Sequence, residues 1–349
     1  MKKLAGVFMS IAAMVSLVGC SVNTEVAGDS SSDTKEENYK VAIMADGAGF
    51  GSQSFNDVAL EGLEKAKQDF GIELLTLEVK EVSDYANSLR SLAQQSVDLI
   101  IIPSSTAKDA VLEVALEYPD TYFGLLDVSA EGVDNVASAS YREEEAAFLL
   151  GALGSRLSKT NKIGFIGGSG STIQDRFQYG FMAGAYAANP ETEVVVSYTG
   201  SFSDVGKGKE IATMMYSDGC DYIAPTAGAC NLGVFQAAQE AGDEKWCFGA
   251  ANGQFNQMPD EIVASQVKKV DTVAYSMVES LVNGTFEGKS KEYGLKENGV
   301  ELMYSPEENM KDIVPQEIKE EMEKLRLEIV EGNIEVPGTS EEYQSYIEK

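Results

Sequence analysis

The sequence predicts an α/β protein with two doubly wound parallel-sheet lobes, and three observations support this prediction. Residues 40–67 combine a short apolar strand, a glycine-rich loop and an amphipathic helix. Residues 162–188 repeat this order of strand, Gly/Ser loop and helix, as a second lobe would require. Elsewhere apolar strands alternate with helical periods, which is typical of parallel sheets covered by helices.

The first of these units places a loop where open α/β sheets bind ligands. The apolar run Val41 to Ala45 ends at an acid and three glycines, and a helical period begins at Ser54-Phe55-Asn56-Asp57. The glycines miss the G-x-G-x-x-G spacing of a dinucleotide site because Ser52 takes the third position, so turn formation explains them better. Phe55 is either a plug of the core or a stacking surface for a flat ligand.

The composition restricts the class of function. A chain of 349 residues is long enough for two domains. Its 27 Lys and Arg stand against 56 Asp and Glu, and the net charge of −29 argues against nucleic acid as a partner. The absence of His removes Ser-His-Asp and Cys-His nucleophiles and imidazole metal sites. Cys220, Cys230 and Cys247 lack C-x-x-C spacing, which favours packing roles, so we expect neither a metal nor a cofactor.

The N-terminus has the features of an exported lipoprotein. Residues 1–19 join a positive start to an apolar run that is too short for a membrane span, which predicts a signal peptide. Leu17-Val18-Gly19-Cys20 resembles a bacterial lipobox, so we expect cleavage before Cys20 and a lipid on this cysteine. Residues 20–38 are polar and Ser-rich and predict a flexible tether. The folded part is expected from Tyr39, outside the cytoplasm and anchored to the bacterial cell membrane.

The other elements follow from apolar runs and helical periods. Strands are expected over residues 73–79, 99–102, 122–126, 194–198, 222–225, 246–250 and 262–266. Helices are expected over residues 84–95, 107–118, 140–157, 172–188, 207–217 and 234–241, and in a further helix up to residue 282. The tail, residues 307–349, is rich in Glu and Lys and predicts a solvated helical layer.

Polar side chains at the ends of these elements are candidates for a site. Asp127 ends a strand and is either a cap or an acceptor that faces the same cleft as Phe55. Residues 143–145 are three acids at a helix start, where capping explains them better than paired-carboxylate catalysis. Arg142 can fork onto a carboxylate across a domain junction or onto a ligand.

Five stretches of the chain, in this order, resemble the basic membrane protein family, the substrate-binding lipoproteins of ABC transporters that include the purine nucleoside receptor of treponemes. They lie between about residues 40 and 305 and read Ser54-Phe55-Asn56, Tyr141-Arg142-Glu143-Glu144, Gly164-Phe165-Ile166-Gly167-Gly168, Gly200-Ser201-Phe202-Ser203-Asp204 with Lys207, and Tyr293-Gly294-Leu295 with Glu297-Asn298-Gly299-Val300.

The resemblance implies a type I periplasmic-binding-protein fold, in which two doubly wound lobes joined by hinge crossovers close on a ligand. Residues 39–138 with about 250–285 are then expected in the N-terminal lobe. Residues 139–249 with about 286–349 are expected in the C-terminal lobe. The ligand cleft is expected between the lobes.

The resemblance also implies the roles of single residues. Phe55 and Phe202 correspond to the two faces of a base sandwich, and stacking contributes roughly 1 to 3 kcal/mol per base. Candidate polar contacts are Asn56, Asp127 and Asp204, and Lys268 is expected near the ribose.

Two departures from the family pattern affect the choice of ligand. Ala251 stands where the family usually has an acid that accepts from ribose, and Ser52 stands where an acid usually contacts the base. An unpartnered buried hydroxyl costs about 1 to 3 kcal/mol. Asn252 or Gln254 can replace the missing acceptor, or the ligand is a free nucleobase or a flavin.

The resemblance implies a binding protein rather than an enzyme: a lipid-anchored receptor that captures a purine nucleoside or a related flat heterocycle and delivers it to an ABC permease and its ATPase. A nucleoside hydrolase would need a carboxylate pair or an oxygen-ligated metal with clustered acids, and Asp127 and Asp204 lie in no recognisable acid cluster. The third alternative is a ligand sensor that feeds a kinase.

Overall fold

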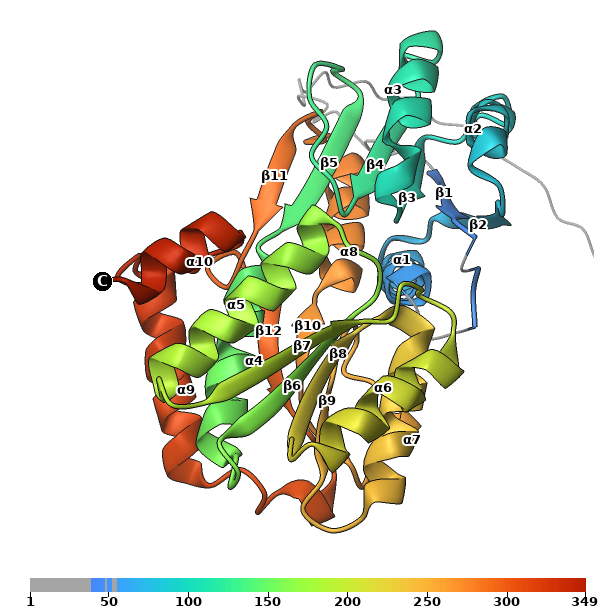
Figure 1. The fold of residues 1–349 in the computed structure, drawn as a ribbon. Coiled ribbons are helices and arrows are strands. Elements are labelled where there is room, and N and C mark those ends of the chain that lie inside the picture. The colour runs from blue at the N-terminus through green and yellow to red at the C-terminus, as the bar shows by residue number, and fades with distance from the viewer. Residues whose placement is uncertain (1–38, 48, 52–54) are drawn as a thin grey trace, which may run out of the picture. The chain divides into compact units, whose positions relative to one another are not determined.

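The computed structural model describes residues 39–47, 49–51 and 55–349, all within one compact unit, Asn38–Lys349. This unit contains two six-stranded sheets with helices on their faces (Figure 1). The predicted α/β architecture of a type I periplasmic-binding protein is therefore confirmed. The expected signal peptide, tether and lipidated Cys20 lie outside the described residues, as does Ser52. In the described part of the chain, none of the helices combines the length and apolar character needed to cross a bilayer.

The first sheet is parallel throughout, with the strand order β11-β5-β4-β3-β1-β2. Its strands are β1 (Lys40–Ala45), β2 (Glu73–Glu78), β3 (Leu99–Ile102), β4 (Tyr122–Leu126), β5 (Val136–Tyr141) and β11 (Ser290–Tyr293). Helices α1 (Phe55–Phe70) and α8 (Val270–Val282) cover one face, and α2 (Tyr85–Ala93) and α3 (Lys108–Glu117) cover the other. Because both faces are covered, β3 and, after Lys40, β1 are continuous apolar runs.

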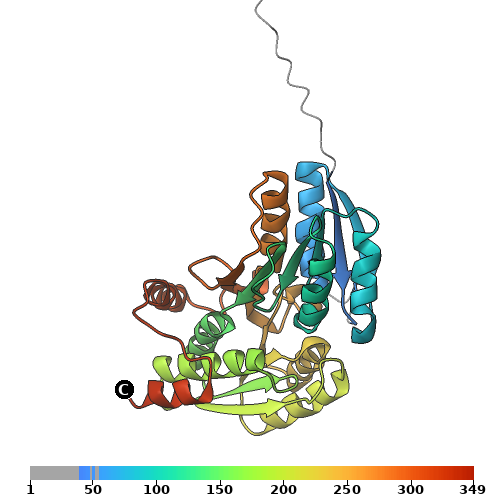
Figure 2. The same cartoon turned by 90° about the horizontal axis from the view of Figure 1, so that it is seen from above.

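The second sheet has the order β12-β10-β9-β8-β6-β7, and only its edge strand β12 runs antiparallel to its neighbour. Its strands are β6 (Lys162–Gly167), β7 (Glu193–Tyr198), β8 (Tyr222–Thr226), β9 (Trp246–Gly249), β10 (Ile262–Lys268) and β12 (Val300–Tyr304). Helices α4 (Glu143–Leu157), α5 (Thr172–Ala188) and α9 (Gln316–Val330) cover one face, and α6 (Val205–Ser217) and α7 (Asn231–Ala241) the other. The last helix, α10 (Ser340–Ile347), lies beside α5 (Figure 2).

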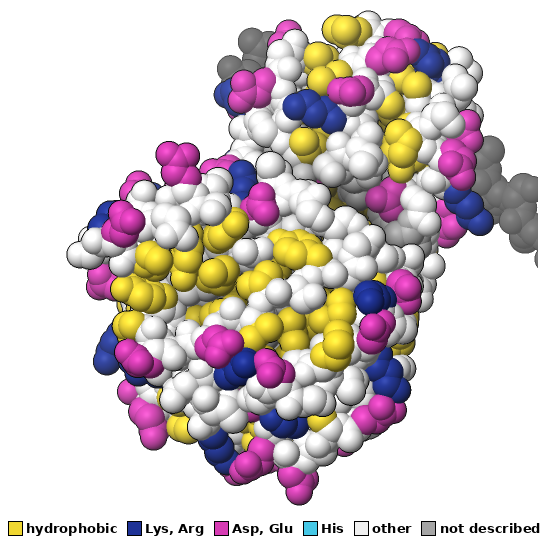
Figure 3. All heavy atoms as spheres, in the orientation of Figure 1, with side chains coloured by type: hydrophobic (Ala, Val, Ile, Leu, Met, Phe, Trp, Pro, Cys, Tyr) yellow, Lys and Arg dark blue, Asp and Glu magenta, His cyan; other side chains and the backbone are white. Residues whose placement is uncertain are grey.

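Two glycines bring α4 and α5 close together. A Cβ atom on Gly184 of α5 would lie 1.8 Å from the carbonyl oxygen of Phe148 on α4, and one on Gly151 would lie 1.9 Å from that of Phe181. The absence of side chains at both positions therefore permits backbone contact. Beyond this contact, half-buried apolar side chains gather on the outer side of the second lobe around α5 and the edge strand β7 (Figure 3).

The chain crosses between the sheets three times: between β5 and α4, between β10 and α8, and between β11 and β12. These crossings differ from the expected lobe boundaries. Strand β10 pairs with β9 and β12 in the second sheet, whereas residues 250–285 were expected in the first lobe. Strand β11 pairs with β5 in the first sheet, although residues 286–349 were expected in the second lobe. The reason is that strand partners depend on long-range pairing, which local periodicity does not report.

The helix expected over residues 140–157 begins only at Glu143, and the residues before it form strand β5. The strand reads VASASY, so β-branched and aromatic residues, which usually indicate a strand, occur only at its two ends and its centre is Ala and Ser. Five of its six residues are buried, so its place inside the sheet determines its conformation. Strand β11, with the polar sequence SKEY, carries an equally weak signal.

Candidate functional site

Residues from both lobes line a cleft with a volume of about 1690 Å³. Most of them follow the carboxyl ends of strands or open the next helix, which is where parallel α/β sheets bind ligands. The first lobe contributes residues after β1, β3 and β4, among them Asp46, Ser104 and Asp127. The second lobe contributes residues at the ends of β8, β9 and β10, among them Thr226, Ala251 and Lys268.

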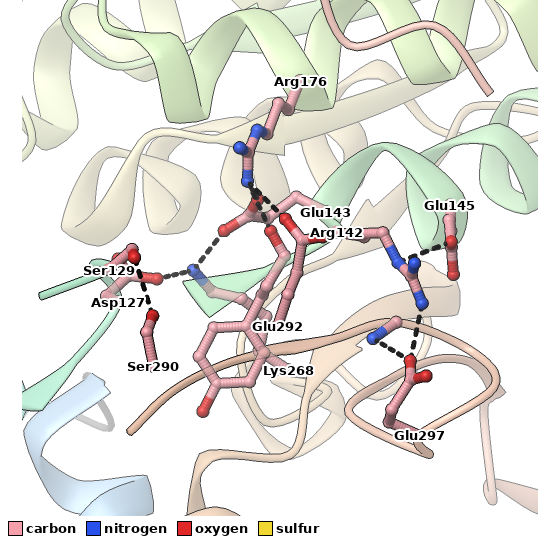
Figure 4. Close-up of polar contacts among 12 residues, drawn as sticks. Asp127, Ser129, Arg142, Glu143, Glu145, Arg176, Lys268, Ser290, Glu292 and Glu297 are labelled. Atoms are coloured by element: carbon pink, nitrogen blue, oxygen red, sulfur yellow. Dashed lines mark hydrogen bonds and ion pairs between the residues drawn. The ribbon is translucent and has the colours of Figure 1, made fainter. Parts of the chain in front are cut away.

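The ammonium group of Lys268 lies between the carboxylates of Asp127 and Glu143 in this cleft (Figure 4). It donates hydrogen bonds to Asp127 Oδ1 and, over 3.0 Å, to Glu143 Oε1. Its Nζ atom also lies 5.0 Å from the ring centre of Phe55, 5.1 Å from that of Tyr141 and 5.8 Å from that of Phe177. The ammonium group of Lys268 therefore contacts three aromatic rings and one carboxylate from each lobe.

The pKa of Lys268 is set by opposing influences. Burial alone lowers it, but the charges and hydrogen bonds of Asp127 and Glu143 raise it by more, so the pKa lies above the usual value for lysine. Glu143 is 1 % exposed, and its second carboxylate oxygen lies 3.4 Å from Arg176 Nη1. Glu143 therefore has a cation on each of its two carboxylate oxygens, Lys268 on one and Arg176 on the other.

Arg176 of α5 extends this network to the first lobe (Figure 4). Its Nη1 atom donates to the carbonyl oxygen of Tyr141 over 2.7 Å and lies 4.0 Å from a carboxylate oxygen of Glu292 on β11. The close packing of α4 and α5 places Arg176 beside Glu143.

The predicted aromatic residues lie on opposite lobes of the same cleft. Phe55 is the first residue of α1, is half-buried and packs against the core of the first lobe. Phe202 follows β7 in the second lobe and is 48 % exposed. Its ring passes so close to Gly168 that a Cβ atom there would lie 2.2 Å from Cε1. Phe55 and Phe202 are therefore available to a ligand, and their role as a base sandwich remains a prediction.

Asn56, also predicted as a contact, shapes the opening loop. Its side-chain nitrogen donates to Asp46 Oδ1 and to the carbonyl oxygen of Gly49, each over 3.0 Å. Its side-chain oxygen is buried and has no hydrogen-bond partner among the described residues. The side-chain nitrogen of Asn56 therefore holds the loop, and its side-chain oxygen remains without a partner in a residue that lines the cleft.

Two of the predicted contacts do not line the cleft. Asp204 caps α6, where its side chain accepts a hydrogen bond from Lys207 N over 3.0 Å. Asn252 follows β9 but lies outside the set of cleft-lining residues, whereas its neighbour Ala251 is among them. Gln254 lines the cleft, but its oxygen accepts from Asn231 Nδ2 and from Ala250 N, each over 3.1 Å, so it holds the loop together. Gln254 is therefore engaged within the protein, and Asn252 as a substitute for the missing acid stays a prediction.

Sequence reasoning missed several charged, aromatic and amide side chains of the cleft wall. Asp46 carried a signal, because it ends the first strand, and Glu143 was explained by helix capping alone. Others are Arg176, Phe177 and Gln266, which only tertiary packing brings to the cleft. Within the described residues, no group of three or more Cys, Asp or Glu could hold a metal ion.

Comparisons with known proteins agree with this architecture. A family model described as ABC transporter substrate-binding protein PnrA-like matches residues 39–340. Basic membrane protein A of Borreliella burgdorferi is 34% identical over 315 residues, covering 89% of this chain and 91% of the relative. The ABC transporter nucleoside-binding protein BmpA of Lactococcus lactis subsp. cremoris is 31% identical over 350 residues, covering 95% and 97%.

A solved structure of a solute-binding protein has the same architecture. A solute-binding protein of an ABC transporter system from Aeropyrum pernix K1 has a TM-score of 0.79 at 27% sequence identity, covering 89% of this chain and 96% of that one. The family match spans both sheets and the cleft between them. The chain therefore belongs to the family of PnrA-like ABC transporter substrate-binding proteins.

Proposed function

We propose that the protein is a lipid-anchored receptor that binds a purine nucleoside, or a related flat heterocycle, and delivers it to an ABC permease and its ATPase. One observation carries the ligand class: the cleft exposes aromatic rings from both lobes, Phe55 and Phe202, around the ion-paired Lys268. The relative from Lactococcus lactis is named a nucleoside-binding protein, which supports the same class.

The aromatic residues supply affinity for a flat ring. Stacking of a base on an aromatic side chain contributes roughly 1 to 3 kcal/mol. A ligand held between Phe55 and Phe202 contacts both lobes, so its binding energy favours their approach. Asp127 and Lys268 then provide an acceptor and a donor for polar groups at the edge of the ligand.

The charges of the cleft favour an uncharged ligand. Its described lining contains the acids Asp46, Asp127, Glu131, Glu143 and Glu292 but only two bases, Arg176 and Lys268. Both bases are already engaged with these acids. A phosphate group would therefore meet an excess of negative charge, which favours a nucleoside over a nucleotide.

The anchor and the partners follow from the sequence and the family. A lipid on Cys20 would hold the folded unit at the outer side of the cell membrane, joined to it by residues 21–38. Family membership supports delivery to an ABC permease. A free nucleobase or a flavin in the same cleft, or a sensor role, are the alternatives within the binding class.

A ligand screen tests the proposal. The full chain with Cys20→Ser, which cannot be lipidated, would be titrated with inosine, guanosine, adenosine, hypoxanthine, riboflavin and ribose by thermal shift and calorimetry. A ligand that binds only the folded state raises the midpoint temperature, and we expect this for the nucleosides. No shift with any nucleoside would refute the ligand class. Free base appearing in the nucleoside samples would instead show a hydrolase.

A further inference from the structure

Gln266 of β10 has an amide group that the protein does not use. The residue is 2 % exposed and lines the ligand cleft. Neither its side-chain oxygen nor its side-chain nitrogen has a hydrogen-bond partner among the described residues, and both atoms are buried. Buried polar side chains nearly always have partners, so this amide requires an explanation.

Two other amides along the same cleft, those of Gln174 and Asn231, are engaged within the protein. Gln174 accepts from Gly168 N and Thr226 Oγ1 and donates to the carbonyl oxygen of Thr226. Asn231 accepts from Ala227 N and donates to the side-chain oxygen of Gln254. These residues hold the loops of the second lobe in place. Gln266 takes no part in such a structural network, so its amide remains available.

The position of Gln266 also favours a ligand contact. Residues two apart on a strand project from the same face, so Gln266 and Lys268 lie side by side along β10. The neighbouring strand β9 ends at Ala250 and Ala251, whose short side chains line the same cleft, and Lys268 N donates to the carbonyl oxygen of Ala251 over 3.2 Å. The wall beside Gln266 therefore lacks another long polar side chain at these two positions.

We propose that Gln266 is a specificity-determining residue whose amide binds an uncharged ligand group that both donates and accepts a hydrogen bond. A hydroxyl group of a sugar and the amide edge of a base share this chemistry. To reach a ligand, the buried amide would have to turn out of the cleft wall by rotation about its side-chain bonds. Lys268 cannot replace it, because an ammonium group donates hydrogen bonds but accepts none. The inference rests on the proposed binding of a nucleoside-like ligand.

Gln266→Met tests the proposal, because methionine keeps the length and most of the volume of the side chain but loses both hydrogen-bonding atoms. Gln68→Met, on the exposed side of α1, is the matched control. Calorimetry with the full chain carrying Cys20→Ser would measure the Kd of inosine, 3′-deoxyinosine and hypoxanthine. We expect Gln266→Met to bind inosine at least about tenfold more weakly, and Gln68→Met to bind it as the parent does.

The three ligands identify the bound group. If the amide binds the sugar, the loss disappears with hypoxanthine, and it disappears with 3′-deoxyinosine when the 3′-hydroxyl is the partner. If the amide binds the base, the loss persists with all three. Equal Kd values of Gln266→Met and the parent for both inosine and hypoxanthine would overturn the assignment.

The stability of the ligand-free protein gives a second readout. Removing an unsatisfied buried amide is expected to raise the midpoint temperature of Gln266→Met by about 2 °C or more. Gln266→Leu is a second apolar variant in case methionine disturbs the packing. If the parent binds none of the three ligands, the proposed function fails, and the melting curves then decide for Gln266 alone. A higher midpoint temperature of Gln266→Met would show that the amide of Gln266 has no structural partner and is free for another ligand. An unchanged or lower midpoint temperature would overturn the inference.

Discussion

Lys268 at the end of β10 and Glu143 at the start of α4 form an ion pair in which Nζ lies 3.0 Å from Oε1. Each residue lies where the chain crosses from one lobe to the other. The same ammonium group also binds Asp127 of the first lobe. The charged centre of the cleft is therefore built on two of the three crossings, so a ligand that disturbs it acts directly on the connections between the lobes.

Lys268→Met is expected to destabilise the folded protein strongly and to abolish ligand binding. The substitution leaves Glu143, 1 % exposed, without the ammonium group and removes the partner of Asp127. Breaking a buried ion pair by deleting one partner costs about 3 to 5 kcal/mol. Urea unfolding measures this loss as a lower midpoint with an unchanged slope.

The neighbouring residue supplies the control for this substitution. Lys269 pairs with Glu301 over 2.8 Å, but both side chains are about a quarter exposed. Such pairs contribute about 0 to 1 kcal/mol, so Lys269→Met should lower the urea midpoint little. Equal losses in the two variants would show that Lys268 is no more than a surface charge.

Phe202→Ala is expected to weaken nucleoside binding with little loss of stability. The side chain is 48 % exposed, so its removal leaves the core intact, whereas a stacked base loses roughly 1 to 3 kcal/mol, or about 5- to 150-fold in Kd. Leu116→Ala, an exposed apolar side chain outside the cleft, is the matched control. Unchanged affinity of Phe202→Ala at unchanged midpoint temperature would remove Phe202 from the site.

The fold and part of the site could be predicted because both depend on local patterns. Apolar runs ending in loops located most strands. The resemblance to the family indicated Phe55, Asn56, Asp127, Phe202 and Lys268 as contacts, and all five line one cleft at the carboxyl ends of strands. The pairing of Lys268 with Asp127 was not predictable, since 141 residues separate them.

Other features depend on contacts that periodicity does not report. The Ala and Ser residues of β5 give no strand signal in the sequence. Only its pairing between β4 and β11 identifies it as a strand. Arg176 reaches the cleft because α4 and α5 pack at glycines. The carboxylate of Asp204 is the kind of group that can bind a ligand, yet one of its oxygens caps α6. Whether a polar side chain can bind a ligand thus depends on how many of its donors and acceptors are already hydrogen-bonded within the protein.

Glu144 is expected to make the stability depend on pH. Burial raises its pKa from 4.5 to about 7, and the charge of Arg176 offsets part of this effect. Between these two values the folded protein keeps a proton that the unfolded chain has released, so the free energy of unfolding falls as the pH rises through this window. The loss amounts to about 3 kcal/mol at most.

Glu144→Gln should remove this loss. The variant is expected to unfold at a higher urea concentration than the parent at pH 8, and the difference should shrink as the pH falls towards 4.5. Glu191→Gln, at an exposed position, should follow the parent at every pH. A difference between Glu144→Gln and the parent that does not change with pH would contradict this assignment.

Ligand binding is expected to bring the lobes together. A base stacked on Phe55 of the first lobe and Phe202 of the second gains both contacts only when the lobes approach, so the closed arrangement binds more tightly and becomes populated. Small-angle scattering of the full chain with Cys20→Ser should therefore show a smaller radius of gyration at saturating inosine than without ligand.

Inosine monophosphate at the same concentration should leave the radius of gyration unchanged, because its phosphate meets the acidic cleft. Phe202→Ala, saturated with inosine at a higher concentration, should close less than the parent because one of the two stacking surfaces is missing. Saturation of the parent, verified by calorimetry, without any decrease in the radius of gyration would mean that binding does not close the lobes.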